Sequence, residues 1–173
     1  MNEILKLKFK WSSDEAVSAF IADSAINCRK PFKYAANLIA MLAISGGVYR
    51  LTVFDWEFFP FALIAGGLYW LLLRRYDQAW SVRRKFKKRP DKDKIVNWAI
   101  STEELNSSVD GIGEASIKWD AISKVVHAQN GFVFYPNDQI HYWLPHTGFS
   151  NEKDIAKLIS LAKTRGSEYI EMA

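Results

Sequence analysis

The chain has 173 residues, of which 49% are hydrophobic and 14% aromatic, enough for one modest domain and a membrane element. Its positive charge is local: residues 74–94 hold ten basic and three acidic residues, whereas residues 95–173 hold six and ten. This distribution argues against a basic nucleic-acid-binding fold. The single cysteine excludes an intramolecular disulfide framework and a thiolate metal cluster.

At the N-terminus, residues 5–11 alternate apolar and lysine side chains, a period of two that predicts a half-buried strand. Ser12 and Glu15 have the spacing of a capping box and predict the start of a helix over residues 13–28. An isolated strand is not stable, and the other predicted strands of the chain all lie after residue 95. Residues 1–30 are therefore expected to join the C-terminal domain.

Two apolar segments follow. Residues 34–54 contain one charge, Arg50, and residues 58–73 contain none. The uncharged cores are shorter than the roughly 20 residues of a membrane span, but residues 51–54 and Trp56 extend them. The alternative is a buried helical hairpin of a soluble protein, which would keep a polar stripe that neither segment has. The sequence predicts a two-helix transmembrane hairpin within residues 31–75.

Small residues recur along both segments and permit close approach of helices in lipid. They either seal the hairpin or drive self-association of the chain. The positions are Ala36, Ala40, Ala43 and Gly47 in the first segment and Ala62 and Gly66 in the second.

Basic residues flank the hairpin on both sides, whereas the turn between the segments has one basic and two acidic residues. The positive-inside tendency places both termini in the cytoplasm. Residues 76–94 form a basic juxtamembrane linker, helical to about Lys88 and ended by Pro90, whose cations would contact anionic headgroups. The predicted membrane-surface patch consists of Arg74, Arg75, Arg83, Arg84, Lys85, Lys87, Lys88 and Arg89.

The pattern of residues 95–173 is that of short strands separated by turns, with Asn130-Gly131 as a hairpin signal. Ser150 or Asn151 caps a final amphipathic helix that stops at Gly166. The predicted fold class is α+β: an antiparallel sheet closed by a C-terminal helix, joined to the membrane hairpin. The expected strands cover residues 96–100, 105–109, 115–119, 123–128, 132–135 and 139–144.

The stretch ASIKWDAISKVVHAQNGFVFYPNDQIHYWLPHTGF, followed by NEKDIAKLISLAK, resembles the YcxB-like family of bacterial membrane proteins. The motifs that carry the resemblance are an I-x-W-x-x-I step, a glycine-headed aromatic hairpin, and a proline followed by an aromatic residue and a helix. The resemblance implies a cytoplasmic domain of pleckstrin-homology (PH)-like fold and assigns no molecular role. The residues considered as an interaction surface are Trp143, Pro145, His146 and Phe149.

No catalytic constellation is found in the sequence, and neither a cofactor nor a small-molecule substrate is indicated. His127 and His141 could hold a metal with Asp120 or Asp138, but the spacing is not that of a usual zinc site, and structural histidines are the favoured interpretation. An enzyme is not expected.

The leading hypothesis is a membrane-anchored interaction or scaffold module that binds the lipid bilayer and a protein partner or its own copies. The alternative is a small membrane immunity or stress-response protein that acts through its spans. A lipid-headgroup sensor is a third hypothesis, but the net negative charge after residue 95 gives it no basic pocket. Nucleic acid is not an expected partner.

Overall fold

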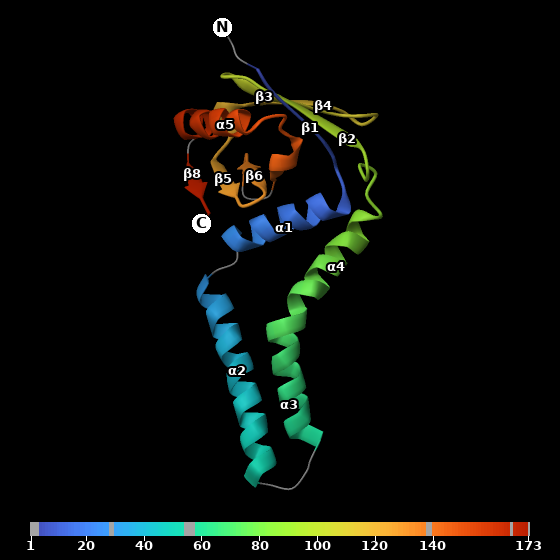
Figure 1. Ribbon diagram of the computed structural model, residues 1–173, viewed down its shortest axis with the longest axis vertical. Coiled ribbons are helices and arrows are strands. Elements are labelled where there is room, and N and C mark those ends of the chain that lie inside the picture. Colours follow the sequence, from blue (N-terminus) through green and yellow to red (C-terminus); the bar gives the residue numbers. More distant parts are fainter. Residues whose placement is uncertain (1–3, 28–29, 54–57, 138–139, 167, 173) are drawn as a thin grey trace. The chain divides into compact units, whose positions relative to one another are not determined.

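The computed structural model describes residues 4–27, 30–53, 58–137, 140–166 and 168–172. It contains two compact units, one built from Met1–Asp23 and Lys85–Ala173 and the other from Ser24–Arg84 (Figure 1). Trp56 and the first residue of the strand predicted over 139–144 lie outside the described residues. The first unit is the sheet unit and the second is the helical unit.

The sheet unit contains a four-stranded antiparallel sheet in chain order, called sheet A. Its strands are β1 (Leu5–Lys10), β2 (Ile95–Ile100), β3 (Glu104–Val109) and β4 (Gly113–Lys118). β1 pairs with β2 along its whole length, although the helical unit separates the two in sequence. The predicted pairing of the N-terminal strand with the C-terminal segment is confirmed.

A second sheet, called sheet B, has the strand order β7-β6-β5-β8. The strands are β5 (Lys124–Ala128), β6 (Gly131–Tyr135), β7 (Tyr142–Pro145) and β8 (Tyr169–Glu171), and β8 runs parallel to β5. The α+β class is confirmed, but the prediction of one antiparallel sheet was wrong. β8 was missed because three residues are too short to show an alternating pattern.

The chain leaves sheet A through a 3-10 turn, η2 (Trp119–Ala121), which explains why there are two sheets. Trp119 is buried, and its indole N–H donates to the Ser101 carbonyl at 2.9 Å. Trp119 was predicted to end a strand. Its side chain anchors the turn against the end of β2 instead, and the chain then enters sheet B at Lys124.

The hairpin predicted at Asn130-Gly131 joins β5 to β6, with Ala128 opposite Gly131. Gly131 lies in the strand, where an added Cβ atom would come within 2.5 Å of the Leu144 carbonyl oxygen and 2.9 Å of Pro145 Cα. The glycine is therefore needed for the close approach of β7.

Two helices and a short turn complete the sheet unit. α1 (Ser13–Asn27), which continues into the helical unit, begins after Ser12, whose hydroxyl accepts from the Glu15 N–H at 3.2 Å. α5 (Glu152–Arg165) is capped by Asn151, whose side chain accepts from the Lys153 N–H. The turn η3 (His146–Gly148) joins β7 to the segment before α5.

The core of the sheet unit comes from the inward face of sheet A and from both faces of sheet B, where the consecutive residues Val125 and Val126 are both fully buried. Leu7, Ile100 and Leu105 from sheet A are at most 1% exposed, and Val125 and Phe132 from sheet B are fully buried. Leu158 and Ala162 of α5 are also fully buried, as the predicted amphipathic face requires. The alternation in β1 confirms the period read from its sequence.

The helical unit contains α2 (Lys30–Val53), α3 (Phe58–Leu68), a π-helical turn η1 (Tyr69–Leu73) and most of α4 (Arg74–Phe86). The helix that begins at Phe58 continues without a break to Phe86, so the predicted basic linker prolongs the second apolar helix. α2 and α3 lie side by side (Figure 1).

Glycines set the distance between α2 and α3. A Cβ atom on Gly47 would lie 2.8 Å from the Pro60 carbonyl oxygen, and one on Gly67 would lie 2.7 Å from the Ala40 carbonyl oxygen. Added Cβ atoms on Gly46 and Gly66 would meet nothing within 4 Å. Small residues therefore seal the hairpin, which is the first of the two roles considered for them.

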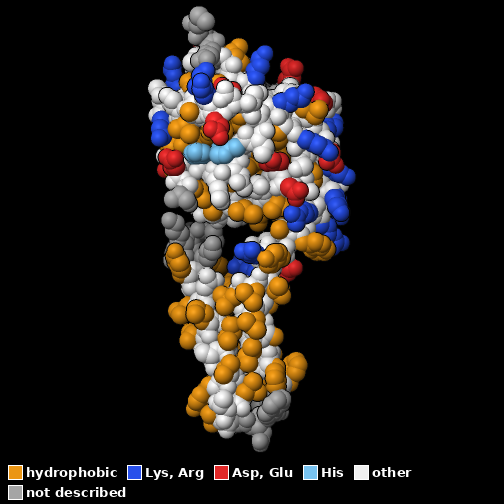
Figure 2. Space-filling model, in the orientation of Figure 1, with side chains coloured by type: hydrophobic (Ala, Val, Ile, Leu, Met, Phe, Trp, Pro, Cys, Tyr) orange, Lys and Arg blue, Asp and Glu red, His pale blue; other side chains and the backbone are white. Residues whose placement is uncertain are grey.

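Both helices are long and apolar enough to cross a membrane, over Tyr34–Val53 and Phe58–Phe86. Only 11% of the apolar window of each is buried, whereas the core helix of a soluble protein would be mostly buried. Hydrophobic side chains cover the helical unit on the face shown in Figure 2, and charged side chains gather on the sheet unit.

Candidate functional site

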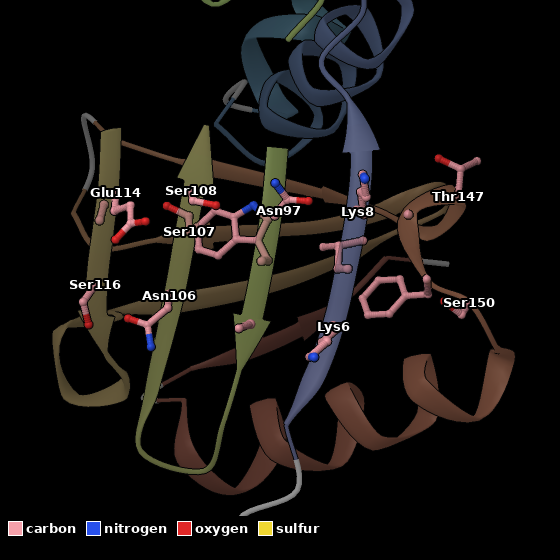
Figure 3. Close-up of a pocket in the computed structure, with 16 residues that line it drawn as sticks. Lys6, Lys8, Asn97, Asn106, Ser107, Ser108, Glu114, Ser116, Thr147 and Ser150 are labelled. Carbon is pink, nitrogen blue, oxygen red and sulfur yellow. The ribbon is translucent and has the colours of Figure 1, made fainter. Parts of the chain in front are cut away.

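The outer face of sheet A carries polar side chains in two rows that cross all four strands (Figure 3). In one row Lys8, Asn97, Ser108 and Glu114 lie opposite one another. The alternation of a strand sends these side chains to the face opposite the core. The second row, two residues along, is Lys6, Ala99, Asn106 and Ser116.

These rows line an open groove of about 960 Å³, called the sheet A groove. Its β1 side carries the two lysines and its β4 side carries one carboxylate, Glu114, so charge changes sign across it. Glu104 of β3, which does not line the groove, accepts from two residues that do: the Asn106 amide at 2.8 Å and the Ser116 hydroxyl at 3.0 Å. These hydrogen bonds lower the pKa of the exposed Glu104 carboxyl.

The β1 side of the groove is closed by residues 147–150. Phe149 forms an isolated antiparallel bridge with Leu7. Gly148 is buried beside it, and a Cβ atom there would lie 2.1 Å from Leu7 Cδ1. The absence of a side chain at Gly148 lets the turn η3 pack against the edge of β1.

The four residues predicted as an interaction surface lie close together in sequence, but they do not form an exposed patch. Trp143, Pro145 and Phe149 are buried, and His146 is half-buried. Trp143 donates its indole N–H to Glu15 of α1 at 2.7 Å. These side chains hold the sheet unit together.

The residues of the predicted membrane-surface patch are exposed except for Arg74, which is half-buried. Three of its arginines in the helical unit lie over aromatic rings: Arg74 over Trp70 at 3.8 Å, Arg75 over Tyr76 at 4.9 Å and Arg84 over Trp80 at 5.4 Å. Exposed pairs of this kind each contribute about 0.5–1 kcal/mol. They keep cations and aromatic rings together, as at the interface of a membrane.

Arg89, in the sheet unit, differs from the other arginines of this patch. It donates to both carboxylate oxygens of Asp91, at 2.8 and 2.6 Å, and lies over the ring of Trp11. Burial acts to raise the pKa of Asp91, but the hydrogen bonds and charge of Arg89 lower it overall. Arg89 therefore forms an ion pair with Asp91 within the sheet unit.

A smaller cavity of about 280 Å³ lies beside this pair and is lined mainly by aromatic and aliphatic side chains. Trp98 lines it, packed edge to face on Tyr142 with ring centroids 5.6 Å apart. The Trp98 indole N–H is buried without a hydrogen-bond acceptor. The sequence held no signal for this cavity, because its residues come from distant segments.

The structure groups the histidines differently from the sequence. His127 Nε2 lies 3.2 Å from His146 Nε2, whereas His141 lies 4.0 Å from Asp23. Asp138 is outside the described residues. Within the described part of the chain, no group of three or more His, Cys, Asp and Glu residues could hold a metal ion. The structure does not bring His127 and His141 together as a metal site, an interpretation that the sequence already disfavoured.

The fold and its surfaces define an α+β domain interrupted by two apolar helices that fit membrane spans. In the comparison with family models, residues 100–162 match the family described as YcxB-like protein, so this stretch is similar to a YcxB-like domain. The match runs from the end of β2 into α5 and confirms the resemblance for that stretch. No curated protein matches the chain. No solved structure matches it either.

Proposed function

We propose that the chain is an integral inner-membrane protein that presents its YcxB-like, PH-like domain as a membrane-anchored interaction or scaffold module. The observation that carries this proposal is the insertion of the helical unit between two paired strands, β1 and β2. An anchor that leaves and returns within one fold confines that fold to the membrane surface. Two sheets followed by a C-terminal helix support the PH-like interpretation.

The membrane placement is supported by the apolar surface of the helical unit. Large side chains such as Leu38, Met41 and Phe58 are at least 58% exposed, and exposed apolar patches of this extent mark membrane or protein contact. An even number of spans returns the chain to the side where β1 lies, as its pairing with β2 requires. The charge distribution favours the cytoplasm for that side.

The partner surface that we propose is the sheet A groove. Its serine and asparagine side chains offer donors and acceptors, its lysines suit a carboxylate, and Glu114 suits a basic group. A polar segment of a protein with charges of both signs would complement it. A free phosphate or lipid headgroup fits less well, because the β4 side is acidic.

Site-specific photo-crosslinking in intact cells tests this surface. A photoreactive residue at Ser108, in the groove, is expected to give a discrete protein adduct, and one at Thr164, on the exposed side of α5, is not. Adducts of the same protein should disappear with Lys8→Glu. Equal labelling from both positions, or labelling that Lys8→Glu leaves unchanged, would contradict a partner in the groove.

Membrane topology has its own test. With Cys28 replaced by serine, a Thr52→Cys variant is expected to react with an impermeant thiol reagent in intact cells, because Thr52 lies near the external turn. A Ser116→Cys variant is the control and should react only after lysis. The reverse pattern would overturn the orientation.

The alternative, an immunity or stress-response protein that acts through its spans, is favoured by one observation. Gly46 and Gly66 leave open space on the outside of the hairpin, where a foreign helix could approach closely. Replacing residues 31–75 with an unrelated hairpin separates the two hypotheses. The module retains its crosslinked partner after the exchange, whereas a protein acting through its spans loses its partners.

A further inference from the structure

A histidine of sheet B and a histidine of the turn η3 face each other through the same ring atom. His127 on β5 and His146 in η3 place their Nε2 atoms 3.2 Å apart, with ring centroids 5.2 Å apart. Phe132 stacks on His127 at 4.5 Å, with an angle of 13° between the rings, and also contacts His146 edge to face. The fully buried Phe132 thus holds both imidazoles in place.

The other ring nitrogen of His127 also has partners. Its Nδ1 atom lies 3.3 Å from the Tyr169 hydroxyl and 3.7 Å from a Glu171 carboxylate oxygen. Both residues belong to β8, and the Glu171 carboxylate lies 3.9 Å from Lys163. An imidazole that binds a metal typically has a carboxylate or another oxygen beside its outer ring nitrogen, as His127 has here.

The pair is also accessible to a cation. The His127 side chain is 17% exposed and His146 is half-buried, so solvent can reach both rings.

We propose that His127 and His146 bind a divalent transition-metal ion of the kind that prefers imidazole nitrogen, such as Zn²⁺. Zinc–nitrogen bonds of about 2.0–2.1 Å in a tetrahedron set two ligand nitrogens about 3.4 Å apart, close to the observed 3.2 Å. Among the described residues no further group joins the pair, so water completes the coordination. The ion would tie β5 to η3, the turn that closes the sheet A groove.

Chemical modification of the unaltered protein tests this inference without any substitution. The full chain, purified in mild detergent without a polyhistidine tag, is treated with diethyl pyrocarbonate in the presence and absence of Zn²⁺. Mass spectrometry is expected to show that Zn²⁺ protects His127 and His146, while His141 is modified equally in both. Equal modification of all three histidines with and without Zn²⁺ would mean a simple hydrogen bond between the imidazoles and would overturn the proposal.

Calorimetric titration with Zn²⁺ provides the second measurement. The wild type is expected to bind one equivalent, and His127→Asn or His146→Asn should weaken binding at least about tenfold, because asparagine lacks an atom at the Nε2 position. His141→Asn is the matched control and should bind as the wild type does. Glu171→Gln, which leaves both ligands, should weaken binding by about tenfold or more. Wild-type affinity in both His127→Asn and His146→Asn would refute the site.

Discussion

Glu15 has a local role at the start of α1 and a second role in hydrogen bonds with residues distant in the sequence. The sequence predicts that it completes a capping box with Ser12, and the Glu15 N–H does donate to the Ser12 hydroxyl. Its carboxylate instead accepts from the Trp143 indole at 2.7 Å and the Thr147 hydroxyl at 3.2 Å. A local motif could not reveal hydrogen-bond donors more than a hundred residues away.

Glu15→Ala is therefore expected to lower the free energy of unfolding of the sheet unit by about 1.5–3 kcal/mol, because the buried Trp143 N–H loses a charged acceptor. Denaturant titration followed by tryptophan fluorescence measures the change. Thr147→Val, which removes the more exposed of the two bonds, should cost less. A smaller effect of Glu15→Ala than of Thr147→Val would contradict this role.

His146 makes the stability of the sheet unit depend on pH. Its pKa is lowered in the folded state, so at a pH between that value and the ordinary 6.5 the unfolded chain binds more protons. Stability therefore falls as pH decreases through this window and levels off below the folded-state pKa. Metal-free protein with His146→Asn should lose this part of the slope, as measured by unfolding at several pH values. An unchanged slope would contradict burial as the cause.

At the scale of elements, the helical hairpin is the feature that composition predicts best. A long apolar segment must be covered by lipid or protein, and both helices meet the length and hydropathy of a span. The sequence did not distinguish which glycines seal the hairpin. That depends on helix rotation, which places Gly47 and Gly67 toward the neighbouring helix and Gly46 and Gly66 away from it.

Gly47→Ala and Gly46→Ala form a matched pair that tests the hairpin. The first puts a methyl group within 3 Å of Ile64 and the Pro60 carbonyl and should destabilise the helix pair by about 1–3 kcal/mol. The second meets nothing within 4 Å and should be neutral. Thermal unfolding in detergent, followed by circular dichroism, compares them. Equal loss in both variants would mean that helix propensity or lipid contact, and not the approach of α3, decides the result.

For the whole molecule, the decisive feature is a domain whose first strand lies before the helical hairpin in the sequence. Leu5, Leu7 and Phe9 of β1 are each at most 8% exposed. Burial of such side chains contributes about 1.5–3 kcal/mol each, against a total stability of about 5–15 kcal/mol for a typical domain. β1 is therefore required for the fold.

Two hairpin-free proteins test this requirement. Residues 1–23 joined to residues 85–173 by a glycine–serine linker should unfold cooperatively, as circular dichroism in denaturant would show. Residues 85–173 alone should not, because β2 loses one of its two neighbouring strands and the core loses three large side chains. Cooperative unfolding of the shorter protein would show that β1 is dispensable.

The sequence by itself determined the α+β class, the two apolar helices, the N-terminal strand, the final helix and the similarity of residues 100–162 to the YcxB-like family. Each of these features follows from local periodicity, composition or a family pattern. All three are properties of the sequence and do not depend on tertiary contacts. Only the tertiary structure decided that there are two sheets, that β8 exists, that Trp143 and Phe149 are buried, and that His127 faces His146. These features depend on which distant segments meet, and that is fixed by packing the whole core and not by any short stretch.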